Sequence, residues 1–64
     1  MADLYRRLAR LLRDAGCEMR RQGKGSHEIW YSPATKRTFS VPTNLTSQRL
    51  ANEILKQAGL PKAF

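Results

Sequence analysis

The fold is decided by residues 17–42, which read CEMRRQGKGSHEIWYSPATKRTFSVP. Three runs in this stretch alternate polar with apolar side chains, which predicts strands that are covered on one face only. The breaks between the runs, residues 23–26 and 32–36, are rich in residues typical of turns. Because both breaks are short, the strands are predicted to form an antiparallel sheet. The runs are residues 17–22, 27–31 and 37–41, and Pro42 ends the last of them.

Two amphipathic helices are predicted on either side of these strands, because apolar residues recur there at the spacing of one helix face. Asp3 is a good N-cap and Gly16 a good end for the helix before the strands. Thr46 or Ser47 caps the helix after them, and Gly59 ends it. The predicted apolar positions are Leu4, Leu8, Leu11, Leu12 and Ala15 in the first helix and Leu50, Ala51, Ile54, Leu55 and Ala58 in the second.

The predicted fold class is therefore α+β, in the order helix, strand, strand, strand, helix. Each helix has one apolar stripe and each strand one apolar face, so both helices are expected to cover the same face of the sheet. The other face is left open to solvent or to a partner. With 64 residues, the chain is expected to be one small domain, residues 1–64, which excludes enzymes that need a separate cofactor domain.

The charge of the chain points to a polyanionic partner. It has 12 Lys and Arg residues against 5 Asp and Glu, for a formal net charge of +7. Nucleic acid, an acidic protein or an anionic membrane would each suit such a surface. No apolar run approaches the length of a membrane span. Cys17 is the only cysteine, which excludes an internal disulfide and favours a reducing, intracellular location.

The side chains best suited to bind an anion and to transfer a proton lie in residues 20–27, RRQGKGSH, at the first predicted turn. Its glycines allow backbone N–H groups to approach an anion closely, and its arginines and lysine can hold a phosphate. A histidine can transfer protons near neutral pH, although a lone histidine is more often structural. Acidic residues are scattered rather than clustered, so no metal site is predicted. The candidate site residues are Arg20, Arg21, Lys24, Gly25, Ser26 and His27.

The aromatic residues of the predicted sheet leave two interpretations of Trp30 open. Trp30 shares a face with Glu28, and it is either a partly buried sheet residue or a platform on which a base or a partner side chain stacks. Tyr31 and Phe39 are predicted to belong to the core. Cys17 is predicted to be a small buried hydrophobic residue.

These motifs together resemble a known family over nearly the whole chain. The sequence resembles the HicA toxin family of bacterial type II toxin–antitoxin systems, above all in the Gly-Ser-His turn and in the last helix with its Gly-Leu end. The chain departs from the family pattern at two places. Many members have an aromatic residue where this chain has Cys17, and a histidine where it has Thr43 or Asn44. The resemblance rests on Gly16, Arg21 and residues 25–27, 41–42 and 54–60.

The resemblance implies a fold like the double-stranded RNA-binding domain. It also implies a ribosome-independent mRNA interferase of the bacterial cytoplasm, with mRNA as substrate, the antitoxin HicB as partner and no membrane. His27 would be its catalytic residue, because the family's catalytic histidine follows Gly-Ser. We expect His27 to act as general base or general acid in an attack by the ribose 2′-hydroxyl, with no metal and no cofactor. The residues expected to bind RNA are Arg20, Arg21, Lys24, Gly25 and Ser26.

Two other classes of function fit the same charge and fold. One is a non-catalytic RNA-binding module, which would tolerate the loss of His27. The other is an adaptor for an acidic protein, in which the basic first helix would matter and the glycine turn would not.

Overall fold

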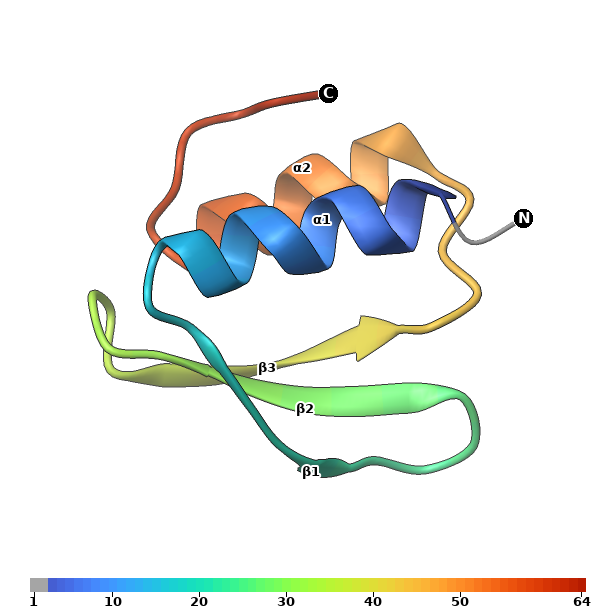
Figure 1. Cartoon of the computed structure of the whole chain (residues 1–64), viewed down its shortest axis with the longest axis horizontal. Helices are drawn as coiled ribbons and strands as arrows, with labels where there is room; N and C mark the ends of the chain where they lie inside the picture. Colours follow the sequence, from blue (N-terminus) through green and yellow to red (C-terminus); the bar gives the residue numbers. More distant parts are fainter. Residues whose placement is uncertain (1–2) are drawn as a thin grey trace.

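The computed structural model describes residues 3–64 and has two layers, a three-stranded sheet and a pair of helices (Figure 1). The strands lie in the order β1-β2-β3, and both pairs are antiparallel. Both helices lie on the same side of the sheet, as predicted, and the C-terminal segment runs over the helices on the side away from the sheet. The elements are α1 (Asp3–Asp14), β1 (Glu18–Gln22), β2 (His27–Ser32), β3 (Arg37–Pro42) and α2 (Gln48–Gln57), which confirms the predicted order.

Both helices end in the same way, at a glycine with a positive φ. After α1, Gly16 has a φ of +89°, and its N–H donates to the Arg13 carbonyl at 2.9 Å. After α2, Gly59 has a φ of +82°, and its N–H donates to the Lys56 carbonyl at 3.0 Å. Glycine adopts this conformation without the strain that a Cβ atom would bring, so both predicted helix ends are confirmed.

The helix starts follow the sequence less closely. Ser47, one of the two predicted caps, begins α2, and its hydroxyl accepts a hydrogen bond from the Leu50 N–H at 3.2 Å. Asp3 is the first residue of α1 rather than the residue before it. Its carboxylate is therefore in the first turn, where it suits the positive end of the helix dipole. Within residues 3–64, neither helix is long and apolar enough to cross a membrane.

The core lies between the helices and the sheet face that they cover, and Trp30 is its largest side chain. Trp30 is fully buried (0% exposed), so it is a core residue and not a stacking platform. Cys17 and Phe39 are buried, as predicted. The other buried apolar residues are Leu8, Ala9, Leu12, Val41, Leu45, Ala51, Ile54, Leu55 and Ala58.

Three predicted core positions are wrong. Tyr31 is only half-buried, because it follows Trp30 in β2 and so points to the opposite face of the sheet, which we call the open face. Leu50 is 43% exposed, because in the first turn of α2 its neighbour Ala51 is the residue that enters the core. Ala15 is exposed because it lies beyond the last turn of α1.

The first strand departs from the predicted alternation. The pairing of β1 with β2 shifts so that Met19 stands opposite Trp30 and Arg21 opposite Ile29, which makes Arg20 the extra residue of a β-bulge. Side chains that stand opposite each other share a face of the sheet. Arg21 therefore lies with Ile29 on the open face, and not with Met19 as strict alternation predicts. The strand is also exposed along its whole length rather than half-buried.

A polar network that the sequence did not reveal ties α1 to β2. The Tyr5 hydroxyl donates to Oε1 of Glu28 at 2.6 Å, and the Trp30 indole N–H donates to the same oxygen at 3.1 Å. Burial, and then the hydrogen bond to the Glu28 carboxylate, raises the pKa of Tyr5 to about 12. The carboxylate of Glu28 is thereby held on the face of the sheet that the helices cover.

Candidate functional site

The turn between β1 and β2 is closed by its own backbone. The Gly23 N–H donates to the His27 carbonyl at 2.7 Å, and the His27 N–H donates to the Lys24 carbonyl at 3.2 Å. A Cβ atom on Gly23 would lie 3.0 Å from the His27 carbonyl oxygen, so a side chain at this position would crowd the turn. Gly25 has a φ of +65° and open space around the position of its missing side chain. An anion could therefore approach the Gly25 backbone closely.

Thr43 anchors the same turn to the end of β3. Its backbone N–H and its hydroxyl both donate to the Ser26 carbonyl, at 2.7 and 2.9 Å. The two bonds leave the Ser26 hydroxyl and the Lys24 side chain exposed. The predicted site stretch is thus an anchored turn whose polar groups face solvent, and sequence reasoning did not identify Thr43 as its anchor.

His27 is the first residue of β2, and its side chain is exposed. It lies on the open face, since the next residue, Glu28, points to the covered face. Its Nδ1 lies 2.9 Å from the hydroxyl oxygen of Ser40 on β3. A hydroxyl at Nδ1 orients the imidazole ring and leaves Nε2 to meet a substrate, either as an acceptor or as a donor according to the tautomer.

Ser40 was not among the predicted site residues, although the sequence held a signal for it. It alternates with the buried Phe39 and Val41, which places its side chain on the open face. In the register of the sheet, Ser40 stands opposite Ile29, one position along that face from His27. This diagonal neighbour could be identified only once the pairing of β2 with β3 was known.

The predicted basic residues are spread along the open face rather than gathered at the histidine. Arg21 stands opposite Ile29, two residues from His27 along β2. The Arg20 guanidinium lies over the ring of Tyr31, 4.5 Å from its centroid, and its Nε is 3.7 Å from the Glu18 carboxylate. The structure therefore brings Lys24, Gly25 and Ser26 together with His27 in one turn. It places Arg21 next along the face and the Arg20 guanidinium over Tyr31, toward the far end of β2.

In the part of the chain that the structure describes, residues 3–64, no acidic side chain forms an ion pair with His27. Glu28, its neighbour in sequence, is bound to Tyr5 and Trp30 on the covered face. Among residues 3–64, no three His, Cys, Asp or Glu side chains lie together in a way that could hold a metal ion. The groups that the site does offer are one exposed imidazole, hydrogen-bond donors and positive charge.

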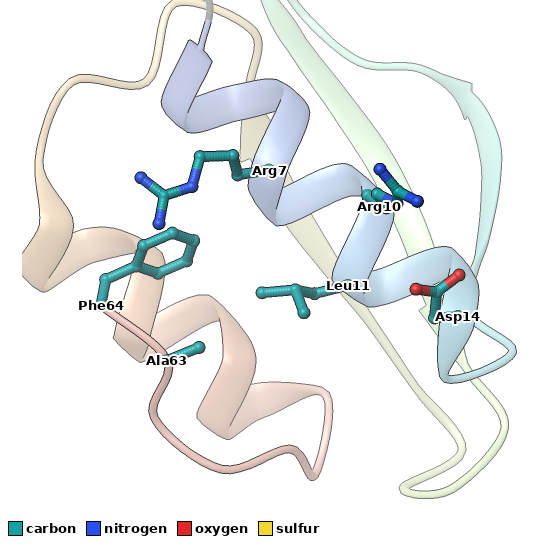
Figure 2. Close-up of a pocket in the computed structure, with 6 residues that line it drawn as sticks. All are labelled: Arg7, Arg10, Leu11, Asp14, Ala63 and Phe64. Carbon is teal, nitrogen blue, oxygen red and sulfur yellow. The ribbon is translucent and has the colours of Figure 1, made fainter.

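A hollow on the helix layer is a separate feature. It lies between α1 and the C-terminal segment, and Figure 2 shows Arg7 of α1 reaching over the ring of Phe64, with Leu11 and Ala63 beside them. The guanidinium carbon of Arg7 is 5.0 Å from the centroid of that ring. The six residues that line the hollow do not include any of the predicted site residues.

Of three comparisons with known proteins, the one with family models gave a match. Residues 5–60 match the family model described as the HicA toxin of bacterial toxin–antitoxin systems. The matched span holds the whole sheet, the turn with His27, and both glycines that end the helices. Searches of curated proteins and of solved structures found no match to the chain.

Proposed function

The chain belongs to the HicA family, the toxins of bacterial toxin–antitoxin systems, and from this premise we propose that it is an endoribonuclease that cleaves mRNA. The observation that carries the proposal is the pairing of His27 with Ser40 on the open face. The contact holds Nδ1 of an exposed imidazole, and in the proposed reaction the other ring nitrogen, Nε2, meets the substrate. The Gly25 backbone and the Lys24 side chain lie in the same turn and offer donors and positive charge for a phosphate.

The proposed reaction uses the nucleophile that RNA carries and DNA lacks. The ribose 2′-oxygen forms a bond to the adjacent phosphorus, and the bond from phosphorus to the 5′-oxygen of the next nucleotide breaks. The 2′-hydroxyl gives up one proton, and the leaving 5′-oxygen takes up one. His27 transfers one of these two protons, and Lys24 and Arg21 stabilise the charge that gathers on the phosphoryl oxygens.

One histidine cannot serve as both base and acid in the same step. His27 is the only histidine of the chain, so the second proton moves through water or a hydroxyl group. No cluster of carboxylates among residues 3–64 would bind a catalytic metal, and the proposed reaction uses none. A single catalytic imidazole without a metal predicts a slow enzyme.

HicA family toxins pair with an antitoxin. We propose that the antitoxin here is a HicB protein and that it covers the open face. The chain carries a net charge of +7, so an acidic partner can cover the same groups that RNA needs. Charge complementarity of this kind mainly accelerates association and makes it depend on salt.

A test in cells separates the toxin from a pure binding module. Wild-type chain is induced in bacteria that lack its antitoxin, beside a His27→Ala variant produced to the same level. The proposal predicts growth arrest and loss of full-length mRNA with the wild type, and neither with the variant, which should still bind antitoxin. Equal toxicity of the two proteins would favour a non-catalytic RNA-binding module instead.

A further inference from the structure

We propose that the open face binds single-stranded RNA and that the stacked pair Tyr31–Arg20 is a platform for one unpaired base. The proposal rests on the proposed function, since it assigns the substrate class and a binding subsite to the same enzyme. It concerns Tyr31, which was predicted to belong to the core. The structure instead leaves that tyrosine half-buried on the open face.

The β-bulge of β1 creates the platform. Because Arg20 is the extra residue of the bulge, its side chain can reach the open face at Tyr31 while Arg21 stands on the same face opposite Ile29. The Arg20 guanidinium lies 4.5 Å from the centroid of the Tyr31 ring. A planar guanidinium over an aromatic ring is a surface on which nucleic acid bases stack.

The platform and the histidine lie on one face of one strand. His27, Ile29 and Tyr31 alternate with Glu28, Trp30 and Ser32, so all three point to the open face. Tyr31 is four residues from His27, or about 13 Å at about 3.3 Å per residue. An RNA strand that crosses this face could place a phosphodiester at His27 and a nearby base on the platform. The half-buried Ile29 lies between them, with Arg21 at its side.

The positive charges of the platform suit an anionic partner, and its aromatic ring favours single-stranded RNA, whose bases can stack on it. Arg20 and Arg21 can each meet a phosphate, and Glu18, beside Arg20, is itself held by that side chain at 3.7 Å. A base can stack on the platform only when it is not stacked inside a duplex, because in a double helix both faces of the base are covered. Single strands expose their bases to aromatic and arginine side chains, whereas A-form duplexes are contacted through their backbone.

The test measures binding in a background that cannot cleave. A fluorescein-labelled single-stranded oligoribonucleotide is titrated with the full chain carrying His27→Ala, alone and combined with Tyr31→Ala, Tyr31→Phe or Arg20→Ala. Tyr31→Ala should raise the Kd by about 5- to 100-fold, the range for loss of one stacked base. Tyr31→Phe should bind as the background does, because it keeps the ring.

The chain offers matched controls for both members of the pair. Phe64→Ala removes another arginine–aromatic pair, in which Arg7 lies 5.0 Å from the ring centroid on the helix side, and it should leave the Kd unchanged. Arg49→Ala removes one positive charge from α2 and should weaken binding less than Arg20→Ala does. The same RNA annealed to its complement should bind more weakly, and Tyr31→Ala should not affect that binding.

The outcomes separate failure of the platform from failure of the proposed function. An unchanged Kd for Tyr31→Ala, or an equal loss for Phe64→Ala, overturns the platform even if the wild-type chain cleaves RNA. A wild-type chain that never cleaves RNA overturns the proposed function, and the binding series then still decides whether the platform exists. If circular dichroism shows that Tyr31→Ala is unfolded, the Kd values of Arg20→Ala and Arg49→Ala test the platform instead, because both side chains are exposed. Equal Kd values for these two variants would then overturn it. Tight binding of an acidic peptide that Tyr31→Ala abolishes, without binding of RNA, would assign the surface to a protein partner.

Discussion

The imidazole Nδ1 of His27 lies 2.9 Å from the hydroxyl oxygen of Ser40, across the pairing of β2 with β3. The contact joins the one histidine of the chain to a residue that is diagonal to it on the open face. A histidine that transfers a proton gains from a partner on its second nitrogen, because that partner fixes the ring and its tautomer. If His27 transfers a proton as proposed, we expect Ser40 to position its ring rather than to touch the substrate.

Ser40→Ala is expected to lower kcat for RNA cleavage by about 2- to 10-fold, the value of one ordinary hydrogen bond, with KM unchanged. Ser40→Thr keeps the hydroxyl and should restore most of the rate. Thr38→Ala is the matched control, because Thr38 is exposed on the same strand and the same face, two residues away. A kcat of Ser40→Ala equal to that of Thr38→Ala would show that the contact does not orient the imidazole.

Antitoxin and RNA are expected to compete for the open face. A complex of the toxin with its antitoxin should not bind the labelled RNA, and added antitoxin should release RNA from the His27→Ala protein. Both associations should weaken as salt rises, since each depends on the positive charges of the chain. The measurement is fluorescence anisotropy at two salt concentrations. Simultaneous binding of RNA and antitoxin, or cleavage by the complex at the rate of the free toxin, would mean that the antitoxin acts from another surface.

Tyr5 is expected to make folding stability depend on pH in the alkaline range. The pKa of Tyr5 is raised from 10.0 to about 12 in the folded chain, so the folded state keeps the phenolic proton that the unfolded state loses first. This contribution is present in full below pH 10 and is lost as the pH rises toward 12. Thermal unfolding of the wild type and Tyr5→Phe between pH 9 and pH 12 measures it. The stability difference between the two proteins should shrink across that window, and a constant difference would contradict the assignment.

The two glycines that end the helices provide a matched pair for a prediction about stability. Both have a positive φ, so Gly16→Ala and Gly59→Ala should each destabilise the fold by about 1 kcal/mol. A Cβ atom on Gly59 would also lie 2.9 Å from the Thr35 methyl group, whereas one on Gly16 would meet Pro33 at an ordinary 3.6 Å. Gly59→Ala should therefore be the less stable variant in urea unfolding. The reverse order would mean that Thr35 moves aside at no cost.

The order of helices and strands could be predicted because it depends on local signals. Apolar residues at helical spacing, alternation in the strands and a glycine at each helix end are all visible along the chain. The face of the sheet to which a side chain points was predicted wrongly where that face depends on how two strands pair. Alternation places Arg21 with Met19, and only the register with β2 reveals the bulge that turns Arg21 to the open face.

The residues of the turn that forms the site could be predicted from the sequence. The residues that hold the turn and the histidine in place could not. Residues 20–27 stand out because glycines, cations and a histidine are concentrated there. Thr43 and Ser40 reach this turn from 17 and 13 residues away along the chain, so no local pattern connects them to it. Tyr31 was predicted to belong to the core, but its neighbour Trp30 points to the covered face. Long-range contacts, which the sequence does not display, bring Ser40 and Thr43 to the turn, and they decide that the helices cover the face of Trp30 rather than that of Tyr31.

The central claim is that His27 cleaves RNA without a metal, and one measurement tests it most directly. Purified wild-type protein and His27→Ala are incubated with the same RNA in excess EDTA, and initial rates of cleavage are compared. We expect the wild type to cleave at the same rate with and without EDTA, and the variant to be slower by about 10²- to 10⁴-fold, the usual effect of losing a general acid or base. Cleavage by His27→Ala at the wild-type rate, or wild-type activity that EDTA abolishes and magnesium restores, would contradict this account.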